Sequence, residues 1–304
     1  MDGILYYKVS DEASAEAALR TKGVDILMPG HVNLPRSKRE KLAKDIPQIT
    51  SEVKGVPVQI GFIPNFKRKP WSDVRVRKAV MLGNDQEAAI TVLTQGDAVR
   101  GGFMPPGPWA IPQEELEKMP GFRKPTEQDL AQARQLLAEA GYPQGFKTTF
   151  LTRGVSNYIA QGTVGKDLLA KIGIEVDLQI KETGAWEEQR RKGDFDAMVY
   201  GVVSVEINEP DIILSRYLSA SSGNYGKYSN PDYDQLYDKQ SQSLDPAVRK
   251  KLILDMQRLL MEDPIAVPYF WESRNTQYWP WVRNFRWVGQ YLGDYRFEDV
   301  WLAQ

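Results

Sequence analysis

Charged side chains that could bind a small molecule stand where two expected strands end. Residues 195–203 are rich in apolar and β-branched residues, which predicts a strand, and they lead directly into a polar loop, residues 204–211. This loop carries Glu206 and Glu209, and Arg153 follows a second expected strand. Open α/β sheets bind ligands in the loops at the carboxyl ends of their strands. The loop at residues 204–211 is therefore the candidate lining of a binding site.

The residues that could catalyse a reaction do not combine into a recognisable centre. Glu206 and Glu209 lie three apart in one loop, a weak signal because paired catalytic carboxylates meet only in the folded structure. His31 is the only histidine and the chain has no cysteine, which excludes a Cys–His pair and a thiolate zinc site. The sequence also lacks a G-x-S-x-G elbow, a P-loop and a dinucleotide-binding G-x-G-x-x-G. We therefore expect a binding protein and not an enzyme, with no metal and no cofactor.

Strand and helix patterns alternate along the chain. The β-α-β-α-β order over residues 146–203 argues for a parallel or mixed sheet covered by helices, so the expected class is α/β. Thr126 and Asp129 resemble a capping box at the start of one helix, and Asp245 followed by Pro246 starts another. Strands are expected at residues 4–9, 24–28, 56–63, 146–152, 174–180, 195–203 and 265–270. Helices are expected at residues 13–21, 35–44, 74–82, 85–93, 127–140, 157–172, 186–192, 212–218, 231–243 and 246–262.

The composition is that of a globular protein without a nucleic-acid partner. The 304 residues suffice for two domains or one large one, and 42% of them are hydrophobic. The 39 basic and 40 acidic residues form no long run of like charge. No stretch approaches the roughly 18 apolar residues of a membrane span. Met1 leads directly into the strand expected at residues 4–9, without the pattern of a signal peptide.

Three segments resemble the family 5 extracellular solute-binding proteins, the peptide- and nickel-binding receptors of ABC importers. They are FDAM…G…NEPD with Y…S…NYGKYSNPDYDQL (residues 195–236), WSDVRVRKAVMLGNDQEAAI (residues 71–90) and GGFMPPGPWAIP (residues 101–112). The similarity runs in order from about residue 2 to residue 302 and covers roughly the C-terminal three-fifths of such a receptor. The front part, to which we assign the export signal, is absent from this chain.

The resemblance implies a fold like the type II periplasmic binding proteins. We expect a mixed-sheet lobe with covering helices, residues 71–270, and part of a second lobe. The second lobe would comprise residues 1–70 and a return segment, residues 271–304. The chain would cross between the lobes near residues 64–70 and 271–279.

The resemblance also implies roles for particular residues. Peptide-binding members pair an acidic residue of this lobe with the α-amine of the ligand, and Glu206 stands at the matching place, two residues before Asn208. Arg153 stands in the loop where such members place an arginine for the carboxylate of the ligand, which a guanidinium fits bidentately. Glu206 and Arg153 would then recognise a zwitterion. The remaining expected ligand-binding residues are Asn208 and the wall residues Asn224, Tyr225 and Tyr228, although core packing suits Tyr228 equally well.

Two departures from the family pattern keep other ligands open. Glu206 replaces the usual Asp, and valines, Val202 and Val203, stand where the family has an aromatic residue. The alternatives to a short peptide are an oligosaccharide, an opine or a nickel chelate, or a truncated lobe without a transport role. Five tryptophans near the C-terminus could stack on a sugar, although the resemblance favours a scaffold role. They are Trp271, Trp279, Trp281, Trp287 and Trp301.

The family's mechanism predicts the partners of this chain. Two lobes would close about a hinge around the ligand, and the closed receptor would dock on the membrane permease of an ABC importer. We accordingly expect a periplasmic or extracellular monomer associated with the membrane through its transporter, and no nucleic-acid partner. Weak binding is expected from a chain that lacks part of one lobe.

Overall fold

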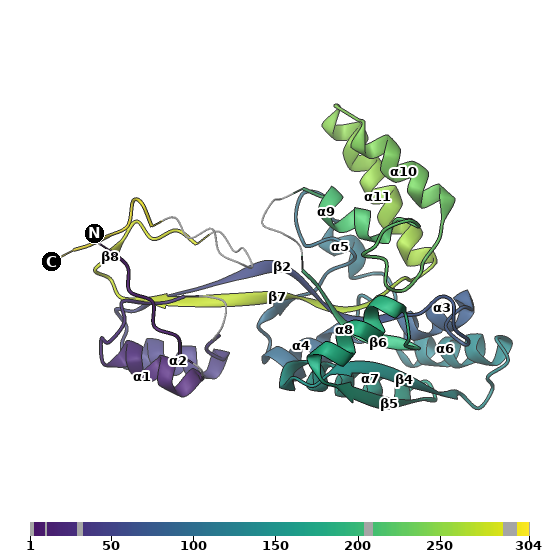
Figure 1. Cartoon of the computed structure of the whole chain (residues 1–304), viewed down its shortest axis with the longest axis horizontal. Helices are drawn as coiled ribbons and strands as arrows, with labels where there is room; N and C mark the ends of the chain where they lie inside the picture. The colour runs from purple at the N-terminus through teal and green to yellow at the C-terminus, as the bar shows by residue number, and fades with distance from the viewer. Residues whose placement is uncertain (1–2, 10, 29–32, 204–208, 288–296, 304) are drawn as a thin grey trace.

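A mixed β-sheet forms the framework of the molecule (Figure 1). The computed structural model describes residues 3–9, 11–28, 33–203, 209–287 and 297–303. Within them, the strand order is β1, β7, β2, β6, β4, β5, and β3 pairs with β7. β4 is parallel to β5 and β6, whereas β2 is antiparallel to β6 and β7. The strands of this sheet are β1 (Ile26–Leu27), β2 (Thr50–Pro64), β3 (Ala98–Val99), β4 (Phe146–Arg153), β5 (Ile174–Lys181), β6 (Ala197–Val203) and β7 (Val267–Tyr278).

Helices pack on this sheet, and the expected α/β class is confirmed. Gly165 marks one close approach, because a Cβ there would lie 2.4 Å from the Tyr269 hydroxyl and 2.9 Å from the Phe150 ring. Thr126 and Asp129 form the expected capping box, and Asp245 caps its helix through the amides of Ala247 and Val248. The helices are α1 (Glu12–Arg20), α2 (Arg36–Asp45), α3 (Val74–Leu82), α4 (Gln86–Thr94), α5 (Gln113–Leu116), α6 (Glu127–Glu139), α7 (Ser156–Ala170), α8 (Thr183–Lys192), α9 (Asp211–Leu214), α10 (Pro231–Ser241) and α11 (Pro246–Glu262), with a 3-10 turn η1 (Ser215–Tyr217).

A long antiparallel ribbon of β2 and β7 joins the two ends of the molecule (Figure 1). Its register runs from Thr50 opposite Tyr278 to Phe62 opposite Val267, with irregularities after Gly55 and Ile60. Gly61 is required at the second irregularity, because a Cβ would lie 2.2 Å from the carbonyl oxygen of Val267.

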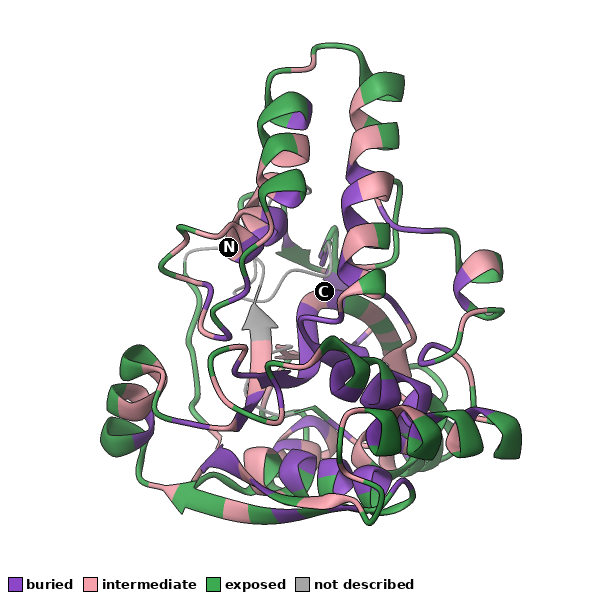
Figure 2. Cartoon of the chain, turned by 90° about the vertical axis from the view of Figure 1, so that its right-hand side faces the viewer, coloured by how far each residue is buried: buried purple, intermediate pink, exposed green. Residues whose placement is uncertain are grey.

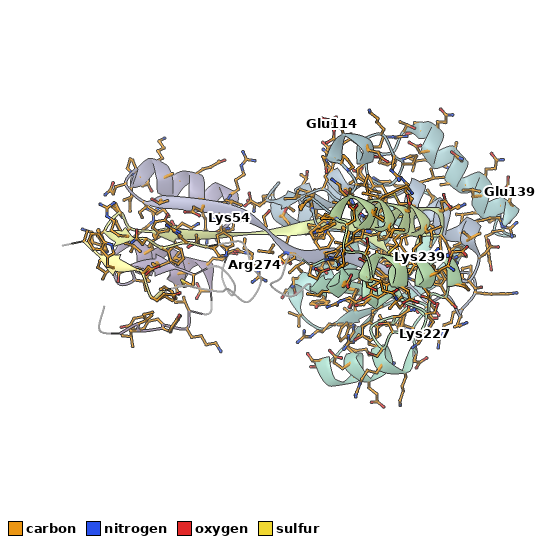
Figure 3. All side chains as sticks on the ribbon, turned by 90° about the horizontal axis from the view of Figure 1, so that it is seen from above. Lys54, Glu114, Glu139, Lys227, Lys239 and Arg274 are labelled. Carbon is orange, nitrogen blue, oxygen red and sulfur yellow. The ribbon has the colours of Figure 1, made fainter. Side chains whose placement is uncertain are left out.

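The middle of this ribbon carries a charged face. Lys54 and Arg274 lie opposite each other on neighbouring strands, where Figure 3 labels both. Two like charges in this position repel, but each has an acidic neighbour two residues away. The Glu52 carboxylate oxygen Oε2 lies 3.1 Å from Nζ of Lys54, and Oε2 of Glu272 lies 3.6 Å from Nη2 of Arg274. Burial raises the pKa of Glu272 above its ordinary value.

The molecule has a main core and a smaller one. The main core surrounds β2, β4, β6 and β7 and includes the fully buried rings of Phe62, Trp71 and Phe150. The smaller core lies beside α1 and α2 and consists of Leu19, Leu34, Leu42, Ile49 and Trp279. The ribbon of β2 and β7 therefore connects two separately packed groups of side chains.

Helices α10 and α11 form a hairpin that stands away from the rest of the chain, and its far end is exposed (Figure 2). Leu244, in the turn between the helices, is 99% exposed. Near the base, Tyr233 is fully buried and its hydroxyl donates to the carbonyl oxygen of Leu214, at 2.9 Å.

The structure differs from the expectations for two strands. Residues 4–9 form no strand. Residues 265–270 and 275–279, expected as a strand and a separate return segment, belong largely to one continuous strand, β7. Among the tryptophans proposed for a sugar platform, Trp271, Trp279 and Trp287 are at most 2% exposed, so those three pack inside the protein as the scaffold alternative required.

Candidate functional site

The candidate site lies along β6, between β2 and β4 in the sheet. Ala197, Met198 and Val199 are fully buried, as expected of a central strand. The strand ends at Val203 and leads to residues 204–208, which lie outside the described residues. Glu206 and Asn208 belong to that segment, so their roles stay predictions. His31 also lies outside the described residues.

Arg153 is the last residue of β4 and lies opposite Lys181 of the parallel strand β5. It is half-buried, its Nε donates to the hydroxyl of Thr183 at 3.0 Å, and its guanidinium lies 5.7 Å from the centre of the Tyr158 ring. Among the described residues, no carboxylate forms an ion pair with it. A guanidinium held by neutral partners retains its capacity for an anionic ligand.

The three expected wall residues come together in one pocket. Asn224, Tyr225 and Tyr228 lie in the loop after η1, and they line a hollow beside β6. The remaining lining residues are Ile63, Phe66, Tyr200, Arg216, Tyr217, Gly223, Gly226 and Ile265. The volume open to the centre of a water molecule is about 20 Å³, enough for roughly one water. In this conformation the hollow therefore admits a water or the tip of a small group.

Asn224 holds the shape of this loop. Its side-chain amide donates to the carbonyl oxygens of Leu218, at 3.1 Å, and Tyr228, at 2.7 Å, and its side-chain oxygen accepts from the amide of Tyr228, at 3.0 Å. The side chain is 7% exposed. The geometry gives Asn224 a structural role, and a direct contact with ligand stays a prediction.

Tyr228 packs as a core residue at the back of the pocket. It is 2% exposed, and its ring meets those of Phe66 and Tyr233 edge to face, at 5.5 Å and 6.0 Å between centres. Burial raises the pKa of the Tyr228 phenol to about 12. The ring therefore supports the pocket as a neutral side chain.

Two arginines adjoin the pocket that sequence reasoning did not single out. Arg216 donates to the Tyr200 hydroxyl at 3.4 Å. Arg190, at the end of α8, lies 4.2 Å from the centre of the Tyr225 ring and pairs with Glu187. Burial raises the pKa of Tyr200, so its hydroxyl stays protonated. For Arg190, the sequence offered only a run of basic residues before Gly193, the glycine that ends α8. Basic residues are equally typical of an ordinary helix C-terminus.

Glu209 is the first described residue after the loop that contains Glu206, and it forms an ion pair with Arg249. Its carboxylate and that of Asp211 both contact Arg249 of α11, the latter at 3.2 Å. Gln240 of α10 also donates to Asp211. The helical hairpin therefore fixes the point at which the chain leaves the loop that contains Glu206.

Within the described ranges, no helix is long and apolar enough to cross a bilayer. The same ranges contain no group of three His, Asp or Glu side chains placed to hold a metal ion.

Comparison with known proteins identifies relatives for most of the chain. Residues 1–225 match the family described as bacterial extracellular solute-binding proteins, family 5 Middle. The periplasmic oligopeptide-binding protein OppA of Salmonella typhimurium is 27% identical over 289 residues, which cover 93% of this chain and 51% of that protein. Heme-binding protein A of Haemophilus influenzae is 27% identical over 281 residues, 88% of this chain and 48% of that protein.

Solved structures give the same result. The unliganded open form of the periplasmic murein tripeptide-binding protein MppA matches with a TM-score of 0.77 and 25% identity, over 90% of this chain and 52% of that one. The agropinic acid complex of AgaA from A. tumefaciens R10 matches with a TM-score of 0.73 and 25% identity, over 93% of this chain and 56% of that one. The chain spans about half the length of the curated relatives it matches.

Proposed function

The chain belongs to the bacterial extracellular solute-binding proteins of family 5, and on that premise we propose that it forms the ligand-holding lobe of a receptor for short peptides. The relatives' names include oligopeptide, murein peptide and heme binders, so membership alone does not select the ligand. We choose a peptide because of the environment of Arg153. Its guanidinium is half-buried at the end of β4 and has no ion-pair partner among the described residues.

The strand register supports a ligand of peptide length. Phe150 of β4 pairs with Ala197 of β6 in parallel, which puts Arg153 level with Tyr200. β6 continues three residues further, to Val203. At ~3.3 Å per residue and ~4.8 Å between strands, the two strand ends lie roughly 11 Å apart. A tripeptide at ~3.5 Å per residue has about this length, and Glu206 follows the end of β6 by three residues in the sequence.

In this proposal the two ends of the peptide meet opposite charges. Glu206 binds the α-amine and Arg153 binds the carboxylate, while Tyr225 and the neighbouring rings form a wall. Arg216 and Arg190, the latter paired with Glu187, also adjoin this wall. Exclusion of water on closure strengthens each of these charge contacts.

We further propose how the lobes divide and move. Residues 71–270 form the ligand-holding lobe, and residues 1–70 with residues 271–304 belong to the other. The β2 and β7 ribbon connects the two cores and is a suitable hinge, because a few residues of an extended connection can absorb a domain rotation. The receptor would work outside the cytoplasmic membrane, as a monomer that docks on an ABC permease.

A ligand panel tests the proposal. We would measure shifts in the melting temperature of the native receptor on addition of each ligand. The ligands are di-, tri- and tetrapeptides, agropinic acid, haem, a nickel–histidine chelate and maltotriose. We expect a saturable rise with at least one peptide and with none of the others. A rise with the opine, haem, the chelate or the sugar alone would replace the peptide by that ligand, and no rise with any of them would favour a lobe without a transport role.

A further inference from the structure

An ion pair joins the two separately packed parts of the molecule beside the ribbon of β2 and β7. Arg39 lies on α2, whose Leu42 belongs to the smaller core. Asp97 follows α4, whose Ala89 belongs to the main core. The Arg39 guanidinium contacts both carboxylate oxygens of Asp97, and its Nη2 donates to Oδ1 at 2.9 Å. Such a two-point contact fixes the orientation of the two groups as well as their distance.

The pair is largely shielded from water. Arg39 is 8% exposed, and its Nη1 also donates to the carbonyl oxygen of Leu34, at 2.9 Å. That carbonyl oxygen accepts a second hydrogen bond, at 3.0 Å, from the side-chain amide of Asn275 in β7. Salt screens a partly buried pair less than an exposed one. The guanidinium therefore ties α2 and Asp97 together beside the middle of the ribbon.

The chain reverses sharply to bring Asp97 to α2. Gln95 ends α4 in the left-handed conformation, with φ of 55°, and Gly96 follows with φ of +91°, where a side chain would be strained. The Ser37 hydroxyl of α2 donates to the side-chain oxygen of Gln95 at 3.4 Å. This turn therefore meets α2 through polar groups, which can separate at a lower cost than a packed apolar interface.

The position of the pair gives the direction of its effect. Figure 1 shows α2 and α4 on one side of the ribbon and α9 on the other. The turn η1 directly follows α9 and contributes Arg216 and Tyr217 to the pocket. A rotation about the ribbon that narrows the pocket side must widen the opposite side. The ion pair therefore opposes closure on the pocket side.

We propose that Arg39 and Asp97 form a latch behind the hinge, which holds the two parts of the receptor open until ligand binds. Both are positioning residues, because they act through the angle between the two parts and not by contact with the ligand. Closure has to separate the pair, so the free energy of the latch is subtracted from that of ligand binding. The inference rests on the two-lobed receptor proposed above, but not on the identity of its ligand.

Spin-label distances in the native receptor without ligand test the latch. These 304 residues contain no cysteine, so labels can be attached at Lys44→Cys on α2 and Val92→Cys on α4. Both side chains are exposed, and both helices lie on the latch side of the ribbon. Arg39→Met with Asp97→Leu removes both charges and so leaves neither buried without a partner. The distance between the labels should then shift to longer values.

Two further variants complete the measurement. Asp97→Asn keeps the shape of the side chain, and it should produce a smaller shift in the same direction even if the double variant fails to fold. Lys147→Met with Glu175→Leu removes an ion pair between β4 and β5, within one part of the molecule, and should leave the distance at its wild-type value. An unchanged or shorter distance in the latch variants would overturn the inference.

Ligand affinity gives a second readout that separates the latch from the peptide proposal. A peptide that stabilises the receptor in the panel above should bind about tenfold more tightly to Arg39→Met with Asp97→Leu than to the wild type. Equal or weaker binding would overturn the latch even at a longer label distance, because the pair would then not oppose closure. If no peptide binds the wild type, the peptide proposal fails, and the label distance alone decides the latch.

Discussion

Arg249 of α11 pairs with Glu209, 40 residues earlier, at the point where the chain leaves the loop that contains Glu206. The same guanidinium lies 3.2 Å from Asp211. The helical hairpin therefore holds one end of a candidate ligand-binding loop through Arg249, and Gln240 of the same hairpin donates to Asp211.

Replacing Arg249 should weaken ligand binding more than it weakens the fold. Arg249→Met removes the ion pairs of Glu209 and Asp211, but both carboxylates are partly exposed, so we expect a loss of no more than about 1 kcal/mol in unfolding free energy. Peptide affinity should fall about tenfold, since the loop loses its fixed exit. Calorimetry and urea unfolding would measure the two effects. Lys251→Met, which breaks an exposed pair with Asp255 on the same helix, is the control and should change neither.

The hydroxyl of Tyr217 should be dispensable for stability. Tyr217 is 8% exposed and its hydroxyl has no hydrogen-bond partner among the described residues. Tyr217→Phe removes an unsatisfied buried group, so unfolding free energy should stay constant or rise by about 1 kcal/mol. Tyr233→Phe is the matched control, because it deletes a hydroxyl bonded to the Leu214 carbonyl and should lower stability by about 1 kcal/mol. Equal losses in the two variants would mean that the Tyr217 hydroxyl has a bonded partner.

Asn224 should matter for stability whether or not it touches ligand. Asn224→Ala removes three hydrogen bonds to the loop backbone and leaves buried backbone groups without partners, so we expect a loss of about 2–3 kcal/mol. Chemical unfolding measures it, with the exposed Asn157→Ala as the control. A full loss of binding at unchanged stability would instead make Asn224 a ligand contact.

Acid should weaken the start of α6. The Arg123 guanidinium and the Thr126 cap lower the pKa of Asp129 to about 2. Because this folded-state pKa lies below the unfolded value, the stabilisation is complete above about pH 4 and is lost as pH falls towards 2. Asp129→Asn should therefore cost at most about 2 kcal/mol at pH 7. The gap between variant and wild type should narrow between pH 4 and pH 2, whereas a constant gap would assign the effect to packing.

The strands and helices of the main sheet were predictable because their signals are local. The period of apolar residues located β4, β5 and β6, and Thr126 and Asp245 marked helix starts that the structure confirms. The prediction of a strand at residues 4–9 was wrong for a physical reason. A strand exists only with a hydrogen-bonded partner strand, and strand propensity says nothing about whether a partner is present.

The site was less predictable than the fold. Asn224, Tyr225 and Tyr228 share a pocket, but the sequence could not show that the Asn224 amide is fully engaged with its own loop. Arg190 and Arg216 approach the pocket from different elements, and such convergence is absent from any local pattern.

The central claim is recognition of both ends of a short peptide, and calorimetry of one tripeptide with capped forms tests it most directly. We would compare the free, N-acetylated and C-amidated tripeptide on the native receptor, its Glu206→Gln variant and its Arg153→Gln variant. Glu182→Gln and Lys181→Gln serve as charge-matched controls. Each cap should weaken binding to the wild type at least tenfold. Acetylation should then cost little in Glu206→Gln, and amidation should cost little in Arg153→Gln. Equal affinities of the wild type for all three forms would contradict the account.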